Sequence, residues 1–124
     1  MSPRSEEFMD QAQERLEAAQ GALAAGHLSV AVSVAYYAML NAARAALSEN
    51  DENTRTHRGA WNAFRIRYVI TDAFDARLFT MAQHAQVARE AGDYAAVTPS
   101  QDEASSYVEG AGDFIAAVER MLTV

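Results

Sequence analysis

The chain has 124 residues, enough for one domain with a sizeable core but too few for two. Half of the residues are hydrophobic and 22% are charged, a globular composition that excludes a disordered or low-complexity chain. A formal net charge of −7 argues against a general nucleic-acid coat, because non-specific binding to phosphates requires excess positive charge. We therefore expect one domain over residues 1–124.

Residue usage favours helices and an intracellular location. The chain has 27 alanines but only 6 glycines and 2 prolines, which predicts an all-α protein. It has no cysteine and therefore no disulfide or thiolate site, which suits a reducing compartment, and we expect the cytoplasm. The N-terminus lacks the apolar core of a signal peptide, and no stretch approaches the roughly 20 apolar residues that span a bilayer. We therefore expect no membrane partner.

Two long helices are predicted first along the chain. From about Ser5 to Ala25, apolar residues recur every three or four positions, and Gly26 supplies a stop. The stretch from His27 to Ser48 carries almost no charge, so it should be buried on most of its circumference. We interpret it as the central helix, followed by a polar loop up to Thr54.

Three further helices complete the prediction. A short one with an aromatic face begins at His57, and a fourth runs from about Asp75 to Ala91 with Gly92 as its cap. The last begins at Thr98-Pro99, where Thr98 is the expected N-cap and Gln101 completes a capping box. Short connections favour antiparallel neighbours, so we expect an antiparallel up-and-down bundle of four to five helices.

The central helix carries a polar stripe, Tyr37, Asn41 and Arg44, at spacings of four and three. Buried polar groups are costly unless they are partnered. One interpretation is a hydrogen-bonded network that fixes helix register or a subunit contact. The alternative is that the stripe lines a site.

A second feature is local positive charge. All ten basic residues are arginine, and no Asp or Glu occurs from Thr54 to Thr71, where four of them lie: Arg55, Arg58, Arg65 and Arg67. The cluster is either a chance grouping on a solvated face or a surface for phosphate or an acidic partner.

A third feature is the segment from Arg89 to Tyr94, where the expected helix end at Gly92 brings Arg89, Asp93 and Tyr94 into one loop. Arg89 and Asp93 form a capping ion pair in one interpretation and part of a functional site in the other. The sequence does not support a metal site. A di-iron bundle needs a glutamate three residues before a histidine, and those positions hold Ala24, Thr54 and Met81. We expect no metal and no cofactor.

These segments together resemble the HEPN family of small bacterial and archaeal helical proteins. The resemblance rests on the run from Ala35 to Leu47, on Thr56-His-Arg-Gly59 with Phe64 downstream, and on Arg89-x-x-x-Asp93-Tyr94. It implies a four- or five-helix bundle, often a homodimer, frequently paired with a small nucleotidyltransferase in a toxin–antitoxin-like system. Some families of this group are metal-independent ribonucleases.

The chain departs from the ribonuclease members in one motif. They use Arg-x4-6-His, in which histidine transfers a proton and arginine stabilises the charge on phosphorus. Here the positions five, six and seven after Arg89 hold Tyr94, Ala95 and Ala96, and Arg77 and His84 match the spacing only inside one predicted helix. Relatives often have a histidine where this chain has Asn41, which cannot shuttle protons.

Two hypotheses follow. The first is a homodimeric module that binds a nucleotide or a nucleotidyltransferase partner, with an anion recess formed by Arg44, His57, Arg58 and Arg89 beside Tyr37 and Asn41. The alternative is a metal-independent ribonuclease, in which Arg89, Asp93 and Tyr94 are the candidate catalytic residues. The tyrosine found near the motif in some relatives also makes Tyr94 a candidate for modification by the nucleotidyltransferase.

Overall fold

The computed structural model describes residues 1–123, and every regular element in that range is helical. This confirms the all-α prediction. The five α-helices are joined by loops, except that a π-helical segment directly continues the third. Their bounds are α1 Pro3–Ala24, α2 Leu28–Ser48, α3 His57–Phe64, η1 Arg65–Val69, α4 Ala76–Ala95 and α5 Gln101–Leu122.

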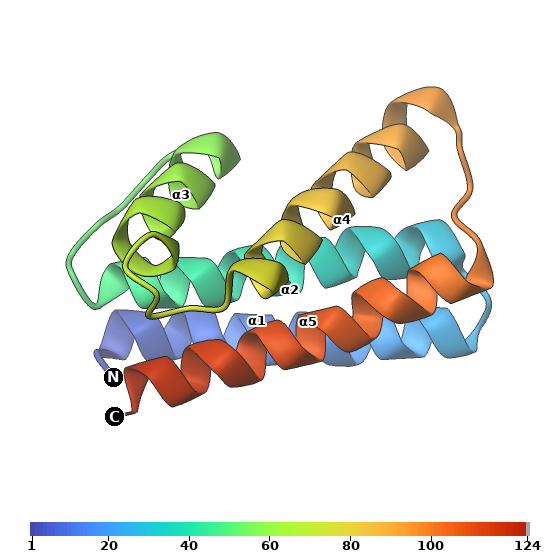
Figure 1. Ribbon diagram of the computed structural model, residues 1–124. Helices are drawn as coiled ribbons and strands as arrows, with labels where there is room; N and C mark the ends of the chain where they lie inside the picture. The colour runs from blue at the N-terminus through green and yellow to red at the C-terminus, as the bar shows by residue number, and fades with distance from the viewer. Residues whose placement is uncertain (124) are drawn as a thin grey trace.

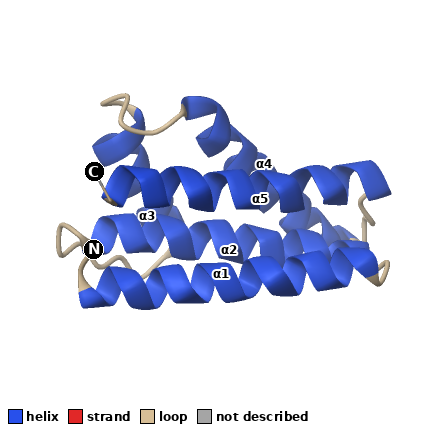
Figure 2. Cartoon of the chain, turned by 90° about the horizontal axis from the view of Figure 1, so that it is seen from below, coloured by secondary structure: helices blue, strands red, loops and turns tan. Residues whose placement is uncertain are grey.

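Helix α2 lies at the centre and contacts each of the other four α-helices. Helices α1, α2 and α5 lie side by side, and each of the three contacts the other two (Figures 1 and 2). Helices α1 and α4 run in one direction and α2 and α5 in the other, as expected for an up-and-down bundle (Figure 1). Helices α3 and α4 both rest on α2 but diverge from each other, and their backbones share no close contact.

The composition of α2 explains its place in the core. Its 21 residues include one charge, and the side chains of Tyr36, Met39, Leu40 and Leu47 are almost completely buried. By length and hydropathy this helix is long enough to cross a membrane, which corrects our expectation that no stretch comes close. Most of its apolar window is buried inside the bundle, so its hydrophobicity is that of a core helix.

Three helix ends differ from the prediction. Helix α1 begins at Pro3 because the Ser2 hydroxyl caps it, accepting a hydrogen bond from the Ser5 amide. Helix α4 passes through Gly92 and ends at Ala96, which adopts the left-handed conformation with φ 55°. Helix α5 is capped by Ser100 instead of Thr98, because the Ser100 hydroxyl accepts from the backbone N–H three residues on. The predicted stop at Gly26 is confirmed, with φ +80°.

An aromatic cluster joins the lower part of α3 to α4 and α5. The rings of Phe64, Phe74 and Phe114 lie 4.8–5.7 Å apart, and the Trp61 ring packs edge-on against Phe79 and Phe114 at about 6 Å. These contacts close the base of the space between α3 and α4, and they confirm the predicted aromatic face of the third helix.

The start of α1 is fixed to the end of α2 by polar contacts. The buried Ser5 hydroxyl lies 2.7 Å from the Ala45 carbonyl and 2.6 Å from the Glu49 carboxylate, which also accepts the Ser2 amide at 2.7 Å. Hydrogen bonds from Ser5 and Ser2 lower the pKa of Glu49 to about 2. The carboxylate is therefore ionised over the whole ordinary pH range.

Candidate anion-binding cleft

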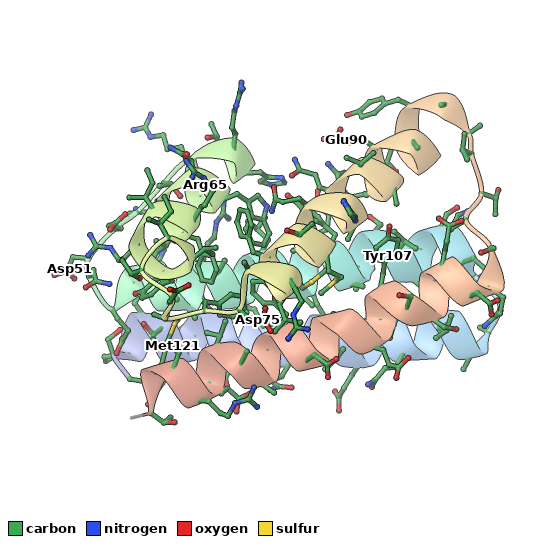
Figure 3. All side chains as sticks on the ribbon, viewed as in Figure 1. Asp51, Arg65, Asp75, Glu90, Tyr107 and Met121 are labelled. Atoms are coloured by element: carbon green, nitrogen blue, oxygen red, sulfur yellow. The ribbon has the colours of Figure 1, made fainter. Side chains whose placement is uncertain are left out.

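The divergence of α3 and α4 leaves a cleft between them, beside α2. One recess in it has a volume of about 430 Å³, lined from α3 and η1 by Arg58, Trp61, Asn62 and Arg65 and from α4 by Phe79, Gln83 and Gln86. Figure 3 labels Arg65 on one arm and Glu90 on the other, on either side of the opening. Helix geometry alone thus places side chains from three elements around one space.

The side chain of Arg89 on α4 lies over two aromatic rings of α2. Its guanidinium carbon lies 5.3 Å from the ring centroid of Tyr36 and 5.3 Å from that of Tyr37, within the range of a cation–π contact. Its Nη1 donates to Asp93 Oδ2 at 2.9 Å, one helical turn further on. The Arg89 side chain is only 13% exposed, so the two rings and Asp93 hold a largely buried positive charge.

His57, the first residue of α3, faces the same rings. Its ring centroid lies 5.6 Å from that of Tyr37, and its Nδ1 lies 3.4 Å from the Tyr36 hydroxyl. That hydroxyl already accepts the Trp61 Nε1–H at 3.0 Å, so its own proton is available to Nδ1. This arrangement favours the tautomer in which Nε2 carries the proton.

The neighbourhood also keeps His57 neutral. Burial lowers the pKa of His57 below its usual value near 6.5, and the positive charges of Arg44 and Arg89 lower it further. At neutral pH, His57 is therefore an uncharged hydrogen-bond donor beside two arginines. An anion entering this space would be attracted by the same charges that disfavour the imidazolium.

Two guanidinium nitrogens in the cleft have unmet hydrogen-bonding capacity. Within residues 1–123, the Nε atoms of Arg44 and Arg89 are buried and have no hydrogen-bond partner. A buried donor without an acceptor costs about 1–3 kcal/mol, and more when it is charged. A ligand oxygen that accepts from either nitrogen would remove the cost at that atom.

Comparison with known proteins places these features in a family. A family model described as the HEPN domain matches residues 5–121, nearly the whole chain. The chain belongs to the HEPN family. A curated protein of the archaeon Methanocaldococcus jannaschii, named as a putative toxin, is 27% identical over 103 residues, which cover 83% of this chain and 70% of that protein. The resemblance inferred from the sequence is thus confirmed.

In this HEPN chain, several of the sequence candidates come together. The Tyr37 ring contacts both His57 and Arg89, the charge of Arg44 lowers the pKa of His57, and Asp93 is paired to Arg89. The polar stripe of α2 forms no mutual network in the described chain, since the Asn41 amide donates to the Tyr37 carbonyl of its own helix at 3.0 Å. Asn41, 8% exposed, therefore bonds to its own helix, and the subunit contact and the site-lining role of the stripe both stay predictions.

Other candidates lie apart. Asp93 and Tyr94 belong to the last turns of α4, which corrects the predicted loop after Gly92. Tyr94 is 84% exposed, so its side chain lies largely in solvent. The basic segment is divided, because Arg67 forms an ion pair with Glu52 while Arg58 and Arg65 line the recess.

Sequence reasoning missed Tyr36 and Trp61. Tyr36 is fully buried and connects Trp61 to His57, so it positions the imidazole of the HEPN cleft. The signal available was Trp61 itself, because a buried indole N–H needs an acceptor. Its partner could not be predicted because the two residues are 25 positions apart. No group of three or more potential metal ligands occurs among residues 1–123.

Proposed function

We propose that this protein is the toxin-like HEPN member of a toxin–antitoxin-like pair, and that its cleft binds the phosphate of a nucleotide or RNA. The proposal is supported above all by the unpartnered, buried Nε atoms of Arg44 and Arg89. Both side chains contribute to the positive potential at His57, whose Nε2–H is a further donor. Three donors from α2, α3 and α4 suit a tetrahedral anion.

The local charge supports an anion although the whole chain is acidic. Asp93 accepts from a single Nη atom of Arg89 and leaves the rest of the guanidinium available, while Glu90, at the opening, accepts from Gln86. The acidic remainder of the surface suits a protein partner better than a long nucleic acid. We accordingly propose a minimal nucleotidyltransferase as that partner, a homodimeric state and a cytoplasmic location.

The test is calorimetric titration with nucleoside 5′-monophosphates at low salt, comparing the wild type with Arg89→Gln. Loss of a charge-assisted contact worth about 1.5–3 kcal/mol should weaken binding roughly 10- to 150-fold. Arg77→Gln is the matched control, because Arg77 lies on the same helix, is 93% exposed and pairs with Asp75. Equal affinities for the two variants, or no binding by the wild type, would contradict the proposal.

A ribonuclease is the second candidate, favoured by one observation. His57 of α3 lies in the same cleft as Arg44 and Arg89, so a histidine and two arginines meet although no histidine follows Arg89 in α4. In such a reaction the ribose 2′-oxygen bonds to phosphorus as the bond to the 5′-oxygen breaks, and the proton lost from the former is matched by one gained by the latter. His57 would carry a proton and the arginines would stabilise the charge on the phosphoryl oxygens.

Cleavage of mixed RNA in EDTA tests this second candidate. Activity should disappear in both Arg89→Gln and His57→Gln and persist in Arg77→Gln. No cleavage by the wild-type protein, with nucleotide binding intact, would leave the binding function alone.

A further inference from the structure

The recess beside the Arg89 cluster has the lining of a binding pocket. Its volume of about 430 Å³ falls within the range of about 300–1,000 Å³ typical of small-molecule sites. The lining residues, all in the described part of the chain, include three side-chain amides and two arginines but no carboxylate. The aromatic side chains of Trp61 and Phe79 form the apolar part of the recess wall.

The side-chain amides of the recess are placed to bind a polar ligand. Gln83 Nε2 is buried and, in the described structure, has no hydrogen-bond partner. Asn62 uses its carbonyl oxygen for Arg65 at 3.4 Å, and Gln86 uses its amide nitrogen for Glu90 at 3.4 Å. Both contacts are long, and each leaves the opposite end of the amide available to a ligand. Donors and acceptors are thus presented together on an apolar background.

The recess adjoins the Arg89 cluster. The Trp61 indole, which forms part of its wall, donates to the Tyr36 hydroxyl at 3.0 Å, and the ring of Tyr36 lies under Arg89. On α4, Gln86 and Arg89 are three residues apart, about 4.5 Å along the helix axis. A ligand whose phosphate rests at Arg89 would therefore place its next flat group between α3 and α4.

We infer that this recess is a nucleobase subsite, in which Gln83, with Asn62 and Gln86, hydrogen-bonds the edge of a base whose phosphate lies at Arg44 and Arg89. Amide side chains present a donor and an acceptor at fixed spacing, the pattern that base edges offer in return. Arg58 and Arg65 lie at the same recess, where a following phosphate of an RNA would be attracted. The inference rests on the proposed function, because the phosphate site anchors the base.

The experiment compares ligands with and without a base. Calorimetry measures the affinity of ribose 5-phosphate and of the four nucleoside 5′-monophosphates for the wild type, Gln83→Leu and Gln11→Leu. Gln83→Leu removes the amide at nearly constant size, and Gln11, exposed on α1, is the matched control. Trp61, the single tryptophan, gives a second readout, since a base in the recess should change its fluorescence.

We expect at least one nucleotide to bind about tenfold tighter than ribose 5-phosphate and to change Trp61 fluorescence. Gln83→Leu should reduce that advantage by about fivefold or more. It should leave ribose 5-phosphate binding unchanged, as Gln11→Leu should for all ligands. A hexanucleotide RNA is a further ligand, used to decide whether the base comes from a free nucleotide or from RNA. If the hexanucleotide binds more tightly than the mononucleotide, and Arg65→Ala abolishes that difference, the source is RNA.

Two results would overturn the inference, and they differ from each other. Equal binding of nucleotides and ribose 5-phosphate by the wild type, or an unchanged preference in Gln83→Leu, refutes the base subsite while the phosphate site stands. Failure of every phosphate-bearing ligand to bind refutes the proposed function itself and the subsite with it.

Discussion

Replacing Tyr36 by phenylalanine tests the chain of contacts from Trp61 to His57. The Tyr36 hydroxyl is the acceptor for the Trp61 Nε1–H at 3.0 Å, and Trp61 is only 3% exposed. Its removal leaves a buried N–H without a partner, which costs about 1–3 kcal/mol. For a domain of this size, each kcal/mol lowers Tm by roughly 4 °C.

Tyr37 provides the matched control on the neighbouring position. Its ring also lies 5.3 Å from the Arg89 guanidinium carbon, but its hydroxyl forms no hydrogen bond within residues 1–123. Tyr37→Phe should therefore change the free energy of unfolding by less than about 0.5 kcal/mol. The two variants differ only in which hydroxyl is lost.

Urea unfolding followed by circular dichroism measures both variants at neutral pH. A double-mutant cycle with Trp61→Phe adds a stricter requirement, because Trp61→Phe removes the donor that Tyr36→Phe leaves unpaired. The double variant should be less destabilised than the sum of the single variants by about 1 kcal/mol. Additive effects, or equal effects of Tyr36→Phe and Tyr37→Phe, would refute the proposed role of the Tyr36 hydroxyl.

Three other predictions concern the periphery of the cleft and the bundle. Glu49 has a pKa of about 2 in the folded protein against 4.5 unfolded, so its contribution to stability is complete above pH 5 and is lost as the pH falls through 2. The Glu49 side chain is a quarter exposed, so solvent screens part of this contribution. Glu49→Gln should therefore cost about 1 kcal/mol at pH 7 and almost nothing at pH 2, measured by urea unfolding at both values. A pH-independent difference would contradict this. The Thr56 hydroxyl caps α3 by accepting from the Gly59 amide at 2.9 Å. Thr56→Ala should therefore lower the free energy of unfolding by about 1 kcal/mol and weaken nucleotide binding, because His57 begins this helix. Thr56→Ser should restore both stability and binding in the same assays. Tyr94 is exposed enough to be reached by an enzyme, and we expect mass spectrometry after co-expression with a partner nucleotidyltransferase to show a nucleotide adduct that Tyr94→Phe lacks; finding only unmodified protein would count against that partner.

The helices themselves were largely predictable, because hydrophobic spacing is a local property. The uncharged run of α2 identified the central helix, and the four-three-four spacing from His57 identified the buried face of α3. The end of α4 was not predictable, since a glycine is compatible both with a cap and with a helix interior. There the chain continues past Gly92 and turns at Ala96 instead, a choice that the local sequence does not determine.

The site was predictable only in part, because it depends on the angle between two helices. Arg44, His57 and Arg89 could each be selected as polar residues next to apolar faces, but the sequence could not place them together. These residues come together only because α3 and α4 both pack on α2 and diverge from each other. The spacing of residues within one helix does not reveal that arrangement. The same reason hid Gln83, whose position on α4 looks like an ordinary half-exposed amide until the facing helix is known.

The absence of close backbone contact between α3 and α4 has an evolutionary consequence. Both helices rest on α2 and meet through the rings of Trp61 and Phe79, while the polar side chains that line the recess form no hydrogen bond across it in the described structure. Substitutions of these amides and arginines would therefore change the walls of the recess while keeping the packing of α1, α2 and α5 intact. One scaffold would then supply many recognition surfaces.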